Sequence, residues 1–123
     1  MKTFKKSPAF LTNLLDEAIE RERKEREELR HRLIIELFDV LDRLSAEASF
    51  SEAYLFGSIA KPYKFSKGSD IDIGFVGLGE EDFFKAMSFI SREIGRDADV
   101  IQLEDHRLAE KIKREGIKWI RKD

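Results

Sequence analysis

The 123-residue sequence has no cysteine, only two prolines and only two histidines. Without cysteine, the chain can form neither a disulfide nor a thiolate metal site, and it offers no thiol nucleophile. Long apolar runs are also lacking, and none approaches the roughly 18 residues that a membrane-spanning helix needs. The basic first ten residues lead into no apolar segment of a secretory signal. We therefore expect a cytoplasmic protein that is not bound to a membrane.

An excess of charge of one sign is lacking as well. The sequence has 23 Lys and Arg against 25 Asp and Glu, which gives a formal net charge of −2. A protein that coats nucleic acid needs a basic surface, because its binding releases counterions from the phosphates. Nucleic acid is therefore not an expected partner. The hydrophobic fraction of 41% and the length fit one domain with a modest core, which argues against disorder throughout the chain.

What the sequence does contain is an unbroken run of nine charged residues, 20–28. Within it Glu22 lies four residues before Arg26, a spacing that stabilises a helix when the two side chains pair. Ser7 followed by Pro8 is typical of a helix N-terminus. Apolar residues recur at helical spacing on both sides of the run. A solvated linker between two helices would also suit the charges, but the spacing favours one long helix.

This helix is expected to run from about Pro8 to Ala46. At 1.5 Å per residue it would be on the order of 58 Å long, which exceeds the width of the core that a chain of this size can build. We therefore predict a helical arm over residues 1–28 and a functional domain over residues 29–123. An apolar patch on the arm, from Phe10 to Ile19, predicts association with a partner protein or with a second copy of the chain.

The remainder of the sequence alternates between short apolar runs typical of strands and segments with helical periodicity. Two glycines, Gly95 and Gly116, are candidates for the residue that follows a helix C-terminus. The expected strands are 53–56, 70–76 and 98–103, the expected helices are 80–94 and 105–115, and residues 117–120 form a short apolar ending.

Two acids on one expected strand are the first candidates for chemistry. Asp70 and Asp72 point to the same face, because side chains alternate along a strand. Two adjacent carboxylates repel each other unless a cation lies between them. Mg²⁺ in proteins commonly takes one or two carboxylates together with substrate phosphates. On their own, the two acids could equally be incidental residues on a solvent-facing strand.

Two further elements accompany the acid pair. Gly57 and Ser58 follow a strand, where a glycine lets the backbone approach a ligand and the N–H groups of a turn can hold a phosphate. Asp99 lies on the strand after the 80–94 helix, and it completes a cluster of three carboxylates if the two strands are neighbours. Asp97 would share the face of Asp99 and is the competing candidate.

With these elements in this order, the sequence resembles the minimal nucleotidyltransferase family of the DNA polymerase β-like superfamily. The family pattern is Gly-Ser, a loop, Asp-x-Asp and a later Asp on a strand. Two departures occur in the loop: residues 59–69 make it one residue longer than usual, and Pro62 stands where the family commonly has glycine. The resemblance covers roughly residues 30–121 and rests on Gly57, Ser58, Ser69, Asp70, Asp72, Asp99, Ile112, Glu115 and Gly116.

The resemblance implies an α+β fold, in which helices pack on a small mixed β-sheet and the long N-terminal helix precedes it. It also implies roles for individual residues, and Asp99 would accept the proton of the acceptor hydroxyl. The acids that would bind two Mg²⁺ and carry the catalysis are Asp70, Asp72 and Asp99. The residues that would hold the nucleoside triphosphate are Gly57, Ser58, Ser69 and Lys61.

The implied activity is Mg²⁺-dependent transfer of a nucleoside monophosphate, AMP from ATP, to an acceptor hydroxyl. Members of the family often act as antitoxins beside a HEPN toxin, and some adenylylate a tyrosine of that toxin. The resemblance therefore implies a HEPN-type toxin as partner and its Tyr as acceptor. The alternative hypothesis is a subunit without catalysis that binds nucleotide or protein and neutralises a partner directly, and the altered loop motivates this alternative.

Three other residues carry weaker signals. The spacing from Arg26 to His31 also occurs in HEPN ribonucleases, but charged helices produce it easily, and this sequence lacks the several helices of that fold. We interpret His106 as an exposed residue at the start of a helix. Trp119 is interpreted as a residue of the core or of a partner surface.

Overall fold

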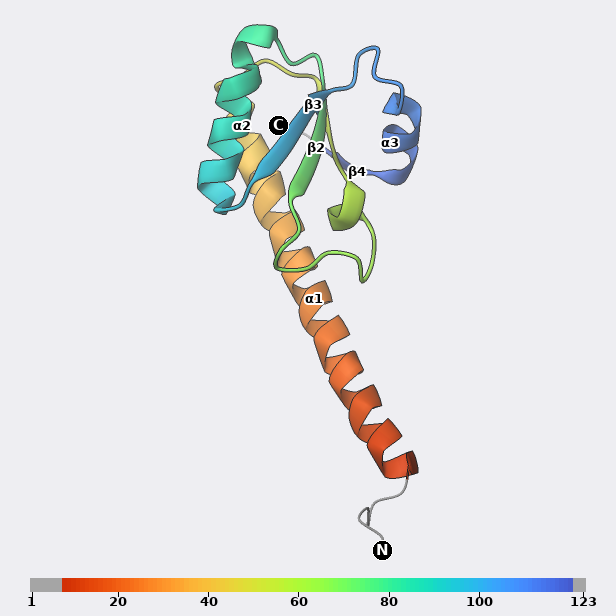
Figure 1. Ribbon diagram of the computed structural model, residues 1–123. Helices are drawn as coiled ribbons and strands as arrows, with labels where there is room; N and C mark the ends of the chain where they lie inside the picture. Colours follow the sequence, from red (N-terminus) through yellow and green to blue (C-terminus); the bar gives the residue numbers. More distant parts are fainter. Residues whose placement is uncertain (1–7, 121–123) are drawn as a thin grey trace, which may run out of the picture.

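The computed structural model describes residues 8–120, and its elements follow the expected order with an additional strand at the C-terminal end (Figure 1). No described helix is long and apolar enough to span a membrane. Ser7, at the expected helix N-terminus, lies outside the described residues. The elements are α1 (Pro8–Leu44), β1 (Glu52–Phe56), the 3₁₀ helix η1 (Gly57–Ala60), β2 (Ile71–Val76), α2 (Glu80–Ile94), β3 (Ala98–Gln102), α3 (Ala109–Glu115) and β4 (Ile117–Trp119).

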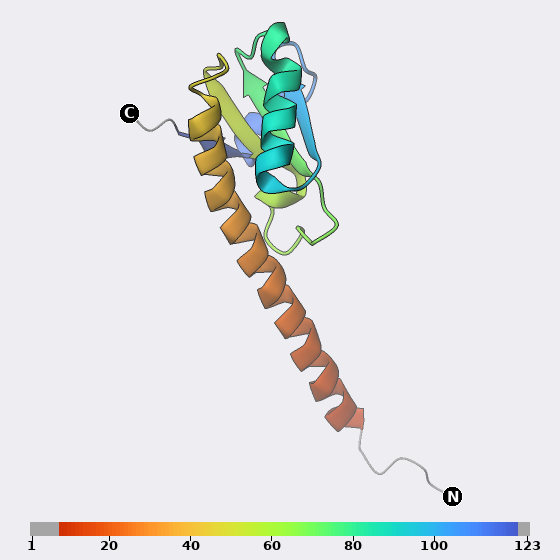
Figure 2. The same cartoon turned by 90° about the vertical axis from the view of Figure 1, so that its left-hand side faces the viewer.

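Helix α1 is a single element of 37 residues, which confirms the long N-terminal helix. It contains no glycine, and its one proline is the first residue, where a backbone N–H would have no partner within the helix. Residues 9–25 are all exposed, whereas Leu33, Leu37 and Leu41 are at most 5% exposed. The C-terminal part of α1 therefore belongs to the core, and its N-terminal part projects beyond the sheet (Figure 2). The domain boundary at residue 28 stays a prediction, because α1 runs through it unbroken.

The four strands form one mixed sheet in the order β3–β2–β1–β4. Strand β1 is antiparallel to both of its neighbours, and β2 and β3 are parallel, with α2 as the crossover between them. Helices α1 and α2 cover one face, where Ile73 and Val100 lie in the main core. Helix α3 covers part of the other face, where Ile112 packs with Tyr54 and Leu103. This is the fold class that the sequence predicted.

Glycine follows both α2 and α3, but for different reasons. Gly95 adopts a left-handed conformation, with φ 74° and ψ 26°, and ends α2 as expected. Gly116 is not left-handed, with φ −81° and ψ 174°. A Cβ atom at this position would lie 2.6 Å from the Ile112 carbonyl oxygen and 2.7 Å from the Leu55 carbonyl oxygen. Glycine at 116 therefore lets the chain pass close to β1 as it leaves α3 and enters β4.

The N-terminus of α3 differs from the prediction, which began this helix at Asp105. The helix begins at Ala109 instead. Asp105 has a left-handed φ of 61°, and the His106 N–H donates a hydrogen bond to the Leu103 carbonyl oxygen. Turns therefore satisfy the backbone between β3 and α3, and the helical periodicity of the sequence extends further than the helix itself.

The C-terminal apolar ending forms the edge strand β4, which the sequence did not predict as a strand. Trp119 lies opposite Ala53 of β1 and is only 2% exposed. Its indole Nε1–H donates a hydrogen bond to Oδ1 of Asp42 in α1, at 2.9 Å. The ring of Phe50 lies 5.2 Å from the Trp119 ring. The interpretation of Trp119 as a core residue is therefore confirmed.

Candidate active site

Two of the expected acids, Asp72 and Asp99, lie in one row across the sheet, on the face that α1 and α2 leave free, and Asp70 lies just before β2. Phe56 of β1 is in register with Asp72 of β2, and Asp72 is in register with Asp99 of β3. Residues in register on neighbouring strands place their side chains side by side on the same face. Asp99 is therefore the direct neighbour of Asp72. Asp97, the competing candidate, precedes β3, and its carbonyl oxygen accepts a hydrogen bond from the Ile71 N–H.

The predicted phosphate-binding turn lies directly over this row. Gly57 begins η1 with a left-handed φ of 74°. A Cβ atom on Gly57 would lie only 2.4 Å from Oδ2 of Asp72. Glycine is thus required twice, for its backbone conformation and for its close approach to the carboxylate. Ser58 is half-buried, and its carbonyl oxygen accepts a hydrogen bond from the Lys61 N–H at 3.1 Å.

The Lys61 side chain is exposed beside this turn. A cavity of about 160 Å³ lies between η1 and α3, and Gly57, Lys61 and Lys111 are among the residues that line it. Two cations next to a glycine turn suit a phosphate ligand, since both can offset its charge. Lys111 was not singled out from the sequence, because nothing in its spacing links α3 to the turn.

Ser69 is engaged within the loop that leads to Asp70. Its hydroxyl oxygen accepts a hydrogen bond from the Ser66 N–H at 3.0 Å. Its carbonyl oxygen accepts a hydrogen bond of 2.7 Å from the guanidinium group of Arg96, whose Cζ lies 5.0 Å from the centre of the Phe65 ring. Ser69 and Arg96 therefore stabilise the loop before the acid pair. Arg96 was missed by sequence reasoning, because 27 residues separate it from Ser69.

Burial and two like charges raise the pKa of Asp72. The half-buried position disfavours its ionised form, and the carboxylates of Asp99 and Asp70 add repulsion. Asp70 itself is exposed immediately before β2, and Asp99 is exposed on β3. Asp70 and Asp99 are therefore both close enough to Asp72 to act on it electrostatically.

The donor set fits a divalent cation. Within residues 8–120, no three His, Asp or Glu side chains are already arranged to hold a metal ion. The carboxylates around Asp72 are nevertheless the hard oxygen ligands that Mg²⁺ prefers. Their repulsion, which together with burial raises the pKa of Asp72, is the interaction that a bound cation would reverse.

Asparagine at position 72 is expected to stabilise the metal-free protein at neutral pH. A carboxyl group with a raised pKa in the folded state binds its proton more tightly there than in the unfolded state, so stability falls as the pH rises between the two pKa values. Asp72→Asn should therefore raise Tm at neutral pH in EDTA and weaken the dependence of Tm on pH. Thermal unfolding followed by circular dichroism from mildly acidic to neutral pH measures both effects.

Asp97→Asn is the control for this prediction, because it removes an acid at the same edge of the sheet without touching Asp72. Mg²⁺ should raise Tm of the wild type and of this control more than Tm of Asp72→Asn. A lower Tm for Asp72→Asn than for the wild type in EDTA at neutral pH would contradict the repulsion inferred at the site.

Comparison with known proteins identifies the family. The sequence profile of the family Polymerase beta, Nucleotidyltransferase matches residues 39–123, well over half of the chain. The chain belongs to this nucleotidyltransferase family. It is a nucleotidyltransferase, as the resemblance implied, and hence a nucleotidyl-transferring enzyme. No curated protein sequence matches the chain significantly.

Solved structures share the fold. A toxin–antitoxin crystal structure with AMP-PNP has a TM-score of 0.58 at 18% sequence identity, covering 70% of this chain and 74% of that chain. A mutant of the toxin–antitoxin pair MntA-HpeT gives a TM-score of 0.57 at 16% identity, with the same coverage of 70% and 74%. A candidate nucleotidyltransferase from Sulfolobus solfataricus gives 0.52 at 24% identity, covering 79% of this chain and 87% of that one.

Proposed function

We propose that this nucleotidyltransferase moves AMP from ATP to a hydroxyl group on a protein partner, and that it depends on divalent metal ions. The observation that carries the proposal is the row of Asp72 and Asp99, with Asp70 beside it, under the left-handed turn at Gly57. A carboxylate cluster next to a turn whose N–H groups can hold phosphate suits a nucleotide with its metal ions.

The acids Asp70, Asp72 and Asp99 would hold two Mg²⁺. Metal ions bound there would neutralise charge on the phosphates and on the attacking and leaving oxygens. The backbone N–H groups of Gly57 and Ser58 hold the β- and γ-phosphates of ATP. The acceptor oxygen forms a bond to the α-phosphorus while the bond from this phosphorus to the bridging oxygen of pyrophosphate breaks. The carboxylate of Asp99 accepts the hydroxyl proton, and pyrophosphate leaves.

The acceptor we propose is a tyrosine hydroxyl of a HEPN-type toxin, so that the chain acts as an antitoxin. Two of the solved structures with the same fold are toxin–antitoxin complexes, one of them with the ATP analogue AMP-PNP. The arm of α1 offers exposed apolar side chains for a protein partner, with Leu11, Leu14, Leu15 and Ile19 between 45% and 64% exposed. Exposed apolar residues that cluster on one surface are typical of interaction sites.

Label transfer tests this function directly. The full chain is incubated with ATP labelled at the α-phosphate, Mg²⁺ and a HEPN toxin as the partner. We expect label on the partner, on a tyrosine located by mass spectrometry, and no label in the presence of EDTA. ATP labelled at the γ-phosphate is the control, because transfer of AMP leaves that label in pyrophosphate. Absence of partner labelling from α-labelled ATP would refute the proposal.

A second candidate function is neutralisation of a partner by binding alone. It is favoured by the hydroxyl of Ser69, which is engaged within the loop. Under this function the partner is inhibited without label, and inhibition survives loss of Asp70 and Asp72. The same incubation therefore distinguishes the two functions, provided that partner activity is measured alongside label.

A further inference from the structure

The root of the arm carries a partly buried ion pair that no part of the proposed reaction uses. Arg30 of α1 is 7% exposed and is the only buried charged side chain of the described residues. Its Nε donates to Oε2 of Glu27 at 3.1 Å, and its Nη2 donates to Oε1 of the same carboxylate at 3.1 Å. A charged side chain is tolerated in a buried position only when it is paired and hydrogen-bonded. The ion pair with Glu27 is therefore what allows the Arg30 side chain to be buried.

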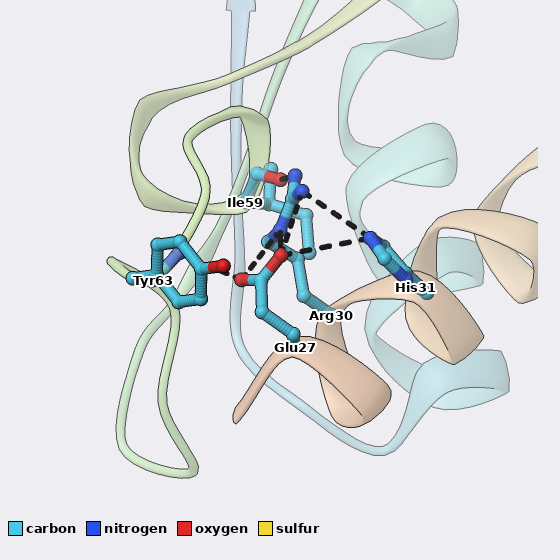
Figure 3. A network of polar contacts seen from close by, with 5 residues as sticks. All are labelled: Glu27, Arg30, His31, Ile59 and Tyr63. Atoms are coloured by element: carbon cyan, nitrogen blue, oxygen red, sulfur yellow. Dashed lines mark hydrogen bonds and ion pairs between the residues drawn. The ribbon is translucent and has the colours of Figure 1, made fainter. Parts of the chain in front are cut away.

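The same pair reaches across to the segment that follows the phosphate-binding turn. The Nη1 of Arg30 donates a hydrogen bond of 3.0 Å to the Ile59 carbonyl oxygen, in η1 (Figure 3). The Oε2 of Glu27 accepts a hydrogen bond of 2.6 Å from the Tyr63 N–H. Tyr63 has a left-handed φ of 63°, and the guanidinium of Arg23 lies 4.3 Å from the centre of its ring. Both ends of the segment 59–63 are thus fastened to α1.

The charges around the pair favour an ionised Glu27. Its partial burial would raise its pKa, but hydrogen bonds from Arg30 and from the Tyr63 N–H outweigh this, so the pKa of Glu27 lies below its ordinary value. His31, four residues after Glu27 on α1, also lowers the pKa of Glu27 electrostatically, and its Nε2 lies 3.6 Å from Oε1 of Glu27. Glu27 is therefore ionised across the neutral range, as its ion pair with Arg30 requires.

The turn itself has few local supports. The 3₁₀ helix that holds Gly57 and Ser58 is four residues long, and no side chain caps its N-terminus. Its position is set on one side by β1 and by the close approach of Gly57 to Asp72. On the other side it is set by the buried Ile59 side chain and by the bond from Arg30 to the Ile59 carbonyl oxygen.

We infer that Glu27 and Arg30 are positioning residues, which hold the Gly57–Ser58 turn over Asp72 in the geometry that receives the nucleotide phosphates. The inference rests on the proposed function, because it assigns the turn to phosphate binding. It also gives the arm a second role: the helix that projects from the domain is fastened, at its root, to the nucleotide site.

The test must separate positioning from a merely structural role. Buried ion pairs can often be replaced by apolar residues of similar volume without loss of stability, whereas removal of one partner leaves the other charge unpaired. The main variant is therefore Glu27→Met with Arg30→Met in the full chain. Glu22→Met with Arg26→Met is the matched control, because Glu22 and Arg26 form an exposed ion pair on the same helix.

The main variant is expected to raise KM for ATP about tenfold or more, the lower end of the range seen when residues that orient metal ligands are lost, and to change kcat less. The control should leave both constants unchanged. Arg30→Lys keeps the charge but loses the planar fork that serves Glu27 and Ile59 together, so it should give an intermediate KM. Equal KM values for the wild type and a folded main variant would overturn the inference.

Hydrogen exchange supplies a readout that does not depend on activity. Backbone amides of residues 57–63 should exchange faster in the main variant than in the wild type, and no faster in the control. If the wild type transfers no nucleotide, the proposed function fails, and this exchange measurement alone decides whether the pair holds the turn. Unchanged exchange over residues 57–63 would then overturn the inference.

Discussion

Replacing Asp70 and Asp72 together by asparagine is expected to lower the rate of nucleotidyl transfer about 10³-fold or more. The substitution keeps the size of each side chain and removes the negative charge that binds metal. Metal ions supply several kcal/mol of transition-state stabilisation in such reactions, and each 1.36 kcal/mol corresponds to a tenfold change in rate. Initial rates of partner labelling, measured with ATP and Mg²⁺ at saturation, give the comparison.

Asp97→Asn is the matched control for this double substitution. It removes one acid from the same edge of the sheet, but Asp97 lies outside the row formed by Asp72 and Asp99. Its rate should stay within a few-fold of the wild type, and Asp99→Asn should lose most of the activity. Undiminished transfer by the Asp70 and Asp72 double variant would show that these acids do not carry the reaction.

Trp119→Ala is expected to destabilise the domain by about 3–5 kcal/mol, the range for removal of a large buried aromatic side chain. This is a large part of the roughly 5–15 kcal/mol that stabilises a typical domain. The indole fills the space between β4, Phe50 and the end of α1, and the substitution also leaves Asp42 without its hydrogen-bond donor. Chemical denaturation followed by circular dichroism measures the loss.

Two further variants serve as comparisons for the effect of Trp119→Ala on stability. Ile120→Ala removes an apolar side chain that is 72% exposed, so it should change stability by less than about 0.5 kcal/mol. Trp119→Phe keeps much of the packing and loses the indole donor, so it should lie between the wild type and Trp119→Ala. If Ile120→Ala cost as much as Trp119→Ala, the assignment of Trp119 to the core would be wrong.

The features predicted from sequence were those that depend on local geometry. Alternation along a strand predicts one face for Asp70 and Asp72, which stays a prediction for Asp70 because β2 begins at Ile71. The helical spacing of leucines is enough to define α1. The αL glycine after α2, Gly95, follows from the same local rules. These predictions need no knowledge of how distant segments meet, which is why they could be made from a single sequence.

The remaining features depend on contacts between distant residues. Spacing left Asp99 and Asp97 open, and the family resemblance favoured Asp99. The place of Asp99 beside Asp72 follows only from the register of β2 with β3. The bond from Arg30 to Ile59 joins residues 29 apart, and that from Trp119 to Asp42 joins residues 77 apart. No spacing in the sequence encodes such pairs. For the same reason, residues 117–119 can be identified as strand β4 only once β1 is known to lie beside them.

Helix α1 also fixes the distance between the exposed apolar residues of the arm and Arg30. It has no glycine and no internal proline between its N-terminal projection and the core, so it contains no sequence-encoded hinge. At 1.5 Å per residue, Leu15 lies about 22 Å along the axis from Arg30, and Arg30 contacts the segment beside the nucleotide turn. Under the proposed function, a partner seated on the apolar residues of the arm would have to present its hydroxyl at a fixed span and angle from its docking point. The length of the helix would then select a partner by its dimensions as well as by its surface.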